Sequence, residues 1–144
     1  MSKRDDITEN IVKVLRDATD PKPIFVTRET INPSELSRQQ FPAVVVVTGD
    51  ETRRESTMIG ATGTRNAIIN VICRCYVTGQ VNIDHERNDI VERVEEALEV
   101  DRTRNGNADD TRLVEVAIDE TIDKRFGLAT MTFEVEYTYT RGAA

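Results

Sequence analysis

Apolar residues form two dense runs in the middle of the chain, separated by a polar stretch. Residues 44–47 are four consecutive valines that follow Pro42 closely. This is typical of a strand buried on both faces, because a half-exposed strand would alternate. Residues 67–77 form a second run rich in β-branched side chains, which we expect to lie beside the first. Residues 51–66 between them are polar, charged and interrupted by glycine. The pattern therefore predicts a long β-hairpin whose polar part projects from the core as an arm.

Two other segments have the spacing of amphipathic helices. Residues 6–18 place Ile7, Ile11 and Leu15 on one face, and Asp5 or Asp6 is suited to cap the start of this helix. Residues 82–100 repeat the spacing, with Asp84 as the expected cap and a charged opposite face that we expect to be solvated.

Three further segments have the composition of strands. They are residues 24–28, 113–122 and 128–140. The last of these alternates cleanly, with apolar and aromatic residues on one face and threonine and glutamate, including Glu134 and Glu136, on the other. The order of elements predicts a single α+β domain over residues 1–144. We expect an antiparallel or mixed sheet of about five to six strands, with two helices packed on one face.

Two of the predicted strands are long for so small a domain. At about 3.3 Å per residue, residues 128–140 would extend ~43 Å and residues 67–77 would extend ~36 Å. Ile68, Ile72 and Tyr76 would also point to the face that the two helices leave uncovered. Either another subunit covers part of that face, or a connecting segment of the same chain folds back over it. The sequence favours neither alternative.

Charge and composition narrow the classes of partner. The chain has 144 residues and a formal net charge of −7, with its basic residues scattered, which argues against a general affinity for nucleic acid. It has no apolar run long enough to span a membrane. The N-terminal residues turn acidic where a signal peptide would become apolar, so we expect the protein to be made in the cytosol.

The sequence shows no catalytic, metal-binding or cofactor-binding motif. Cys73 and Cys75 would point to the same face of one strand, which suits a disulfide poorly, and we expect both to be core residues. His85 is the single histidine and is expected at an exposed helix start. Residues 101–111 have the spacing of a calcium loop, but Arg112 stands where the bidentate acidic ligand would be needed. We therefore predict no enzyme activity, no metal and no cofactor.

The whole pattern resembles the tail terminator (tail completion) proteins of long-tailed bacteriophages. The resemblance covers nearly the whole chain and rests on the following segments: the helix that begins near Asp6, the PAVVVV strand, the ETRRESTMIGATGTRN arm, the NAIINVICRCYV strand, the IDHERNDIVERVEEAL helix and the closing MTFEVEYTYTR strand. It implies a structural virion protein that forms a homo-oligomeric ring, usually a hexamer. Such a ring caps the tail tube, stops its polymerisation and provides the surface that joins tail to head.

The resemblance also implies partners and a location. The partners would be further copies of the chain, the tail tube protein and a head-completion or neck protein, with DNA passing through the ring without specific binding. The protein would be assembled in the host cytoplasm and reside in the virion, at the head-proximal end of the tail. Family members have no catalytic residue to carry over to this chain.

On this basis two surfaces become candidate sites. We expect the arm to contact a neighbouring subunit or the tube through a group of five residues: Arg53, Arg54, Glu55, Met58 and Ile59. We expect the strand face around Glu134 and Glu136 to be polar and treat it as a candidate surface of the ring lumen. Two other readings remain open. One is a head–tail connector or neck subunit, and the other is a small cytosolic enzyme or regulator.

Overall fold

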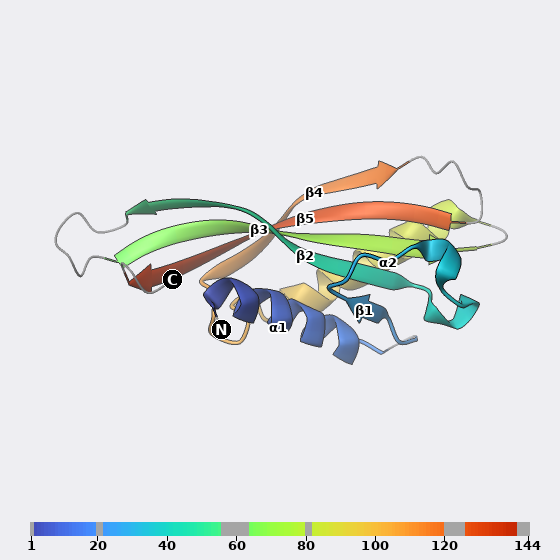
Figure 1. The fold of residues 1–144 in the computed structure, drawn as a ribbon, viewed down its shortest axis with the longest axis horizontal. Coiled ribbons are helices and arrows are strands. Elements are labelled where there is room, and N and C mark those ends of the chain that lie inside the picture. Colours follow the sequence, from blue (N-terminus) through green and yellow to red (C-terminus); the bar gives the residue numbers. More distant parts are fainter. Residues whose placement is uncertain (1, 20–21, 56–63, 80–81, 120–125, 141–144) are drawn as a thin grey trace.

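The computed structural model describes residues 2–19, 22–55, 64–79, 82–119 and 126–140. This part of the chain contains two helices, two short 3-10 turns and five strands (Figure 1). Their order is α1 (Lys3–Asp17), β1 (Phe25–Thr27), turns at Pro33–Glu35 and Arg38–Gln40, β2 (Ala43–Glu55), β3 (Thr64–Thr78), α2 (Ile83–Glu99), β4 (Asp110–Asp119) and β5 (Phe126–Thr140).

The five strands form one mixed sheet in the order β1-β2-β3-β5-β4. β1 runs parallel to β2, and the other neighbours are antiparallel. The predicted α+β class, the mixed sheet and the long β2–β3 hairpin are therefore confirmed. The parallel β1 arises because the turns after it carry the chain back along the sheet before β2 begins.

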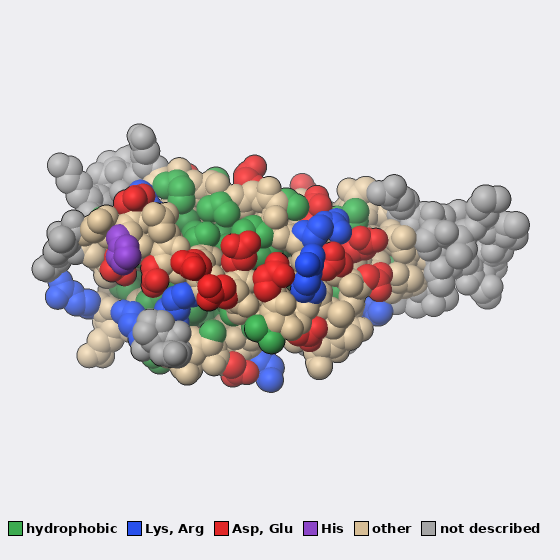
Figure 2. Space-filling model, turned by 180° about the vertical axis from the view of Figure 1, so that it is seen from behind, with side chains coloured by type: hydrophobic (Ala, Val, Ile, Leu, Met, Phe, Trp, Pro, Cys, Tyr) green, Lys and Arg blue, Asp and Glu red, His purple; other side chains and the backbone are tan. Residues whose placement is uncertain are grey.

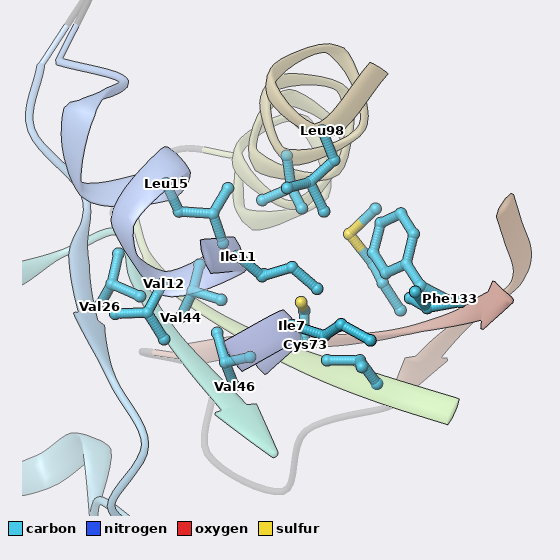
Figure 3. Close-up of a cluster of buried hydrophobic side chains, with 14 of the residues drawn as sticks. Ile7, Ile11, Val12, Leu15, Val26, Val44, Val46, Cys73, Leu98 and Phe133 are labelled. Atoms are coloured by element: carbon cyan, nitrogen blue, oxygen red, sulfur yellow. The ribbon is translucent and has the colours of Figure 1, made fainter. Parts of the chain in front are cut away.

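The core lies between the two helices and one face of the sheet. Alternate residues of β3 point to that face and are fully buried, among them Ile69, Val71 and Cys73. The helices supply apolar residues at three- and four-residue spacing to the same buried cluster as the strands, and Figure 3 shows part of that cluster. They are Ile7, Ile11 and Leu15 from α1, and Ile90, Val94 and Leu98 from α2. Because one apolar cluster includes residues of both helices, both pack on the same face, as the sequence predicted.

Both predicted helix caps are wrong by a few residues. α1 begins at Lys3, and the amide of Asp5 donates to the side chain of Ser2 at 3.2 Å. α2 is capped by Asn82, whose side-chain oxygen accepts from the amide of His85 at 3.0 Å. A cap must lie just before the first helical turn, so the acidic residues inside that turn only complement the helix dipole.

Two β-bulges lie at the same level on opposite sides of the central β3–β5 pair. One interrupts β2 after Thr48, which pairs with Val71, and the other interrupts β4 after Leu113, which pairs with Phe133. Val71 and Phe133 themselves pair across β3 and β5. Bulges increase the local twist of a strand. In Figure 1 the strands converge in this region, and β2, β3 and β5 continue beyond α1.

The projecting arm is therefore a three-stranded extension of the sheet. β3 and β5 have 15 residues each, or about 50 Å when extended, and they pair along their whole length as far as Thr64 and Thr140. Residues 51–55 of β2 pair with β3 on the other side. We call this extension, residues 51–55, 64–69 and 135–140, the arm base.

Candidate assembly surfaces

Side chains from β2 and β5 connect the two outer strands of the arm base. The hydroxyl of Tyr137 donates to a carboxylate oxygen of Glu51 at 2.5 Å, and Arg53 forms an ion pair with the other oxygen. The guanidinium of Arg53 also lies 4.7 Å from the ring centre of Tyr139. A cation placed over an aromatic face is attracted by the ring quadrupole. These contacts hold the arm base in one arrangement.

The surroundings of this network shift two pKa values. Burial, followed by the hydrogen bond to Glu51, raises the pKa of Tyr137 to about 12. Burial opposes ionisation of Glu51, but the hydrogen bonds from Tyr137 and Arg53 together lower the pKa of its carboxyl below the ordinary value. At neutral pH the pair is therefore a neutral phenol donating to a carboxylate, which is a strong hydrogen bond.

The five predicted arm contacts fall into three groups. Arg53 is described fully and binds Glu51 and Tyr139 of its own chain. For Arg54 and Glu55 only the backbone is described; it is part of β2 and pairs with Asn66 and Arg65 of β3. The side chains of Arg54 and Glu55, and the whole of Met58 and Ile59, lie outside the described residues. Their contact with another subunit remains a prediction.

Glu134 and Glu136 lie on the sheet face that points away from the helices. Their side chains are 36% and 34% exposed, and Arg112 of β4 lies within 3.4 Å of Glu134 and 3.5 Å of Glu136. Asp110 extends the group by its contact with Arg112 at 3.6 Å. These side chains form a charge network in which Arg112 contacts three carboxylates, and Asp110 also pairs with Arg102 at 2.7 Å. Their placement in a ring lumen remains a prediction.

The sheet face that points away from the helices, here called the open face, can be covered either by another subunit or by a connecting segment of the same chain. The structure shows which of these covers one end of it. Phe41, from the connection before β2, stacks on Phe126 with ring centres 5.6 Å apart, at the end of β5 that pairs with Thr78. Here the chain does fold back over its own sheet. Further along the same face, Tyr76 and Ile72 are half-buried, and Val45, which pairs with Arg74 between them, is buried. A partner subunit would therefore cover only the part of the open face that the chain itself leaves exposed.

The opposite face of the molecule combines an acidic helix with an apolar strand. α2 has seven carboxylates and two arginines, so it accounts for −5 of the net charge of −7. Arg87 donates to the carbonyl of Asp119, and Arg93 donates to the carbonyl of Lys22. Figure 2 shows acidic side chains in a band across this face, with hydrophobic side chains gathered along its upper edge. These arginines connect elements within the chain.

The turn between α2 and β4 is organised by its own side chains. Asp101 accepts hydrogen bonds from the amides of Thr103 and Asn105 at 2.9 and 3.0 Å, respectively. Arg104 is fully buried and donates to the carbonyls of Leu98 and Asp101, which closes the end of α2. The Asp101 carboxylate thus binds amides of its own loop. Among the described residues, no group of three His, Cys, Asp or Glu side chains could hold a metal ion.

The two cysteines and a cleft beside α2 are other places where reactive or charged groups gather. Cys73 and Cys75 are both buried free thiols, and burial raises the pKa of Cys73 to about 12. A cleft of about 450 Å³ opens beside the start of α2, with Lys22, Arg38 and Asp89 among its lining residues. Cations and carboxylates are mixed along its wall. The residues that line this cleft therefore form no cluster of a single charge that would bind an oppositely charged ligand.

Sequence reasoning missed the network of Glu51, Tyr137 and Tyr139. The alternation of β5 correctly placed both tyrosines on the apolar face, but Glu51 is 86 residues away along the chain. Only the pairing of β2, β3 and β5 brings these side chains together. Their local sequence contains no signal for this contact.

No protein-family model matches the chain, and no curated protein sequence matches it. Neither helix in the described part of the chain is long and apolar enough to cross a membrane.

Proposed function

We propose that the protein is a structural virion subunit that forms a ring on a phage tail tube, stops tube polymerisation and provides the head-joining surface. The observation that supports this most is the arm base. Three strands continue beyond the helices, and contacts between Glu51, Tyr137 and Arg53 stiffen them. A projection of this kind is costly to order unless it contacts another molecule.

The geometry suits a subunit that joins its neighbours head to tail. The arm base lies at one end of the sheet and α2 lies over the other half, as Figure 1 shows. An arm that binds a different surface on the next copy makes a heterologous contact, and such contacts produce closed rings when the rotation closes. The resemblance to tail terminators, which rests partly on the same arm and strands, also implies a ring.

The charge network around Glu134 and Glu136 supports a role for the open face in the lumen. A surface with more carboxylates than cations repels the DNA backbone and would let DNA slide through. Replacing both glutamates by lysine should leave ring assembly intact and slow DNA ejection. Unchanged ejection by rings of normal size would remove the lumenal assignment.

The decisive test of the function is a phage that lacks this gene, observed by electron microscopy. A terminator predicts overlong tails without heads. Tails of normal length that remain unattached would instead indicate a head–tail connector or neck subunit. In vitro, adding the purified protein to polymerising tail tube protein should shorten the tubes, and tubes of unchanged length would count against termination.

The arm itself can be tested by shortening. Residues 51–55 and 64–66 belong to strands, so a cut through residues 51–66 would remove part of the sheet. Replacing residues 56–64 by Asn-Gly leaves two residues between Glu55 and Arg65, so it preserves the β2–β3 pairs and suits a two-residue hairpin. We expect this variant to fold and to lose ring or tube binding. Normal termination of tails by the shortened protein would show that the arm is only a loop.

A further inference from the structure

β4 presents an apolar strip at the edge of the sheet. Val114, Val116 and Ile118 are 49%, 40% and 46% exposed. β4 has 10 residues and pairs with β5 on one side, and no described strand pairs with its outer side. An exposed edge strand with apolar side chains tends to associate with another chain. We call these three side chains the β4 strip.

The acidic face of α2 borders the β4 strip. Val116 and Ile118 pair with Met131 and Ala129, so they lie on the helix-covered side of the sheet, next to α2. The hydrogen bond from Arg87 to the carbonyl of Asp119 holds the helix against the strand. The combined surface is apolar along one side and strongly negative along the other, as Figure 2 shows. Such a surface fits a partner that is both apolar and basic.

The arm has that chemistry. Residues 51–66 contain three arginines and two glutamates, and also Met58 and Ile59. Because Arg53 pairs with Glu51, the remaining charges of the arm are two arginines and one glutamate. In Figure 1 the arm base extends away from the half of the molecule that carries α2. An arm that points away from this surface can meet the same surface only on a second copy.

We propose that the β4 strip and the acidic face of α2 receive the arm of a neighbouring copy. This inference rests on the proposed ring and names the surface that closes it. Apolar side chains of the arm cover the β4 strip, and Arg54 faces the α2 carboxylates, while Arg53 stays in its own network. Each copy gives one arm and receives one. The contact is therefore heterologous and repeats around the ring.

A charge exchange tests the pairing. In the first variant, Glu92→Arg and Glu95→Arg reverse the charge at two exposed positions of α2 and reduce the net charge of the helix from −5 to −1. In the second variant, Thr52→Glu and Arg54→Glu reverse the arm and leave Arg53 in its network. We expect each variant alone to assemble on the order of 10-fold more weakly by sedimentation velocity. Mixing the two, or combining all four changes in one chain, should restore assembly.

An apolar variant and a control complete the test. Val116→Asp with Ile118→Asp should weaken assembly by roughly 10- to 100-fold. Glu29→Arg with Glu35→Arg makes the same charge change as the α2 variant on a distant exposed segment and should assemble normally. A thermal melt of each variant separates misfolding from lost assembly.

The outcomes distinguish the inference from the function on which it rests. Wild-type rings together with α2 and β4 variants that assemble normally would overturn the inference and leave the proposed ring in place. Failure of the combined variant to recover assembly, with its melt unchanged, would overturn the pairing of arm and α2. A wild-type protein that stays monomeric even with tail tube protein would overturn both.

Discussion

Replacing Tyr137 by phenylalanine tests whether the arm base is held by its hydrogen bond to Glu51. The substitution keeps the ring and removes the hydroxyl that donates to the carboxylate at 2.5 Å. The Glu51 side chain is only 8% exposed, so water cannot fully replace the lost donor. Arg53 remains as its partner. The ring contact with Tyr139 is unaffected because the aromatic face stays in place.

The magnitude follows from the charge on the acceptor. A hydrogen bond to a charged group contributes about 1.5–3 kcal/mol, more than one between neutral groups. We therefore expect the free energy of unfolding to fall by about 1.5–3 kcal/mol at pH 7. For a chain of this size each kcal/mol lowers the melting temperature by roughly 3–5 °C.

The difference between wild type and Tyr137→Phe should depend on pH. The pKa of Glu51 is lowered in the folded protein, so its contribution is present above the ordinary carboxyl pKa, about 4.3. That contribution is lost as pH falls through the lowered pKa. The stability gap between the two proteins should therefore narrow below about pH 4.

Urea unfolding at several pH values measures this gap, and Tyr139→Phe is the matched control. The hydroxyl of Tyr139 has no hydrogen bond among the described residues, so its loss should change stability by less than about 0.5 kcal/mol. Equal losses in the two variants would refute the reasoning, because packing alone would then explain both. A gap that stays constant down to pH 3 would refute the charged acceptor.

Three more predictions concern the core and its turns. Arg104→Ala should lower the free energy of unfolding by about 2–4 kcal/mol in urea titrations, since it removes the donor that closes the end of α2. Arg104→Met should lower it less, because the longer side chain fills the space while the two unpaired buried nitrogens of Arg104 are also removed. Gly127→Ala should lower stability by about 1–3 kcal/mol by thermal melting, because a methyl group there would lie 2.5 Å from Ile83. Cys73 and Cys75 should resist iodoacetamide in the folded protein at pH 8 and react after urea is added, as mass spectrometry would show, because burial raises both thiol pKa values.

Local pattern predicted most of the fold, with limits at the element ends. The 3.6-residue spacing located both helices, and the alternation of residues 128–140 oriented β5 correctly. The caps were missed because several polar residues near each helix start are suited to that position, Ser2 and Asn82 among them, and only the backbone shows which one precedes the first turn. The parallel pairing of β1 depends on residues 28–42 reversing the chain direction, which periodicity does not report.

The candidate sites were predicted less completely than the fold. The polar face of Glu134 and Glu136 followed from alternation within one strand. Their bridging by Arg112 required the register of β4, which a bulge shifts by one residue. The exposure of Val116 likewise required knowing that β4 is an edge strand, because an apolar residue in a central strand would be buried.

The sequence by itself determined which faces of each helix and strand are apolar, because side-chain periodicity follows from backbone geometry alone. It therefore determined the α+β class, the core and the presence of a polar arm between two buried strands. Only the tertiary structure decided that β5 joins β2 and β3 in the arm base, that Glu51 meets Tyr137, and that the β4 strip lies beside the acidic helix. These features depend on strand order and register between distant segments, which many sequences with the same local pattern could satisfy differently.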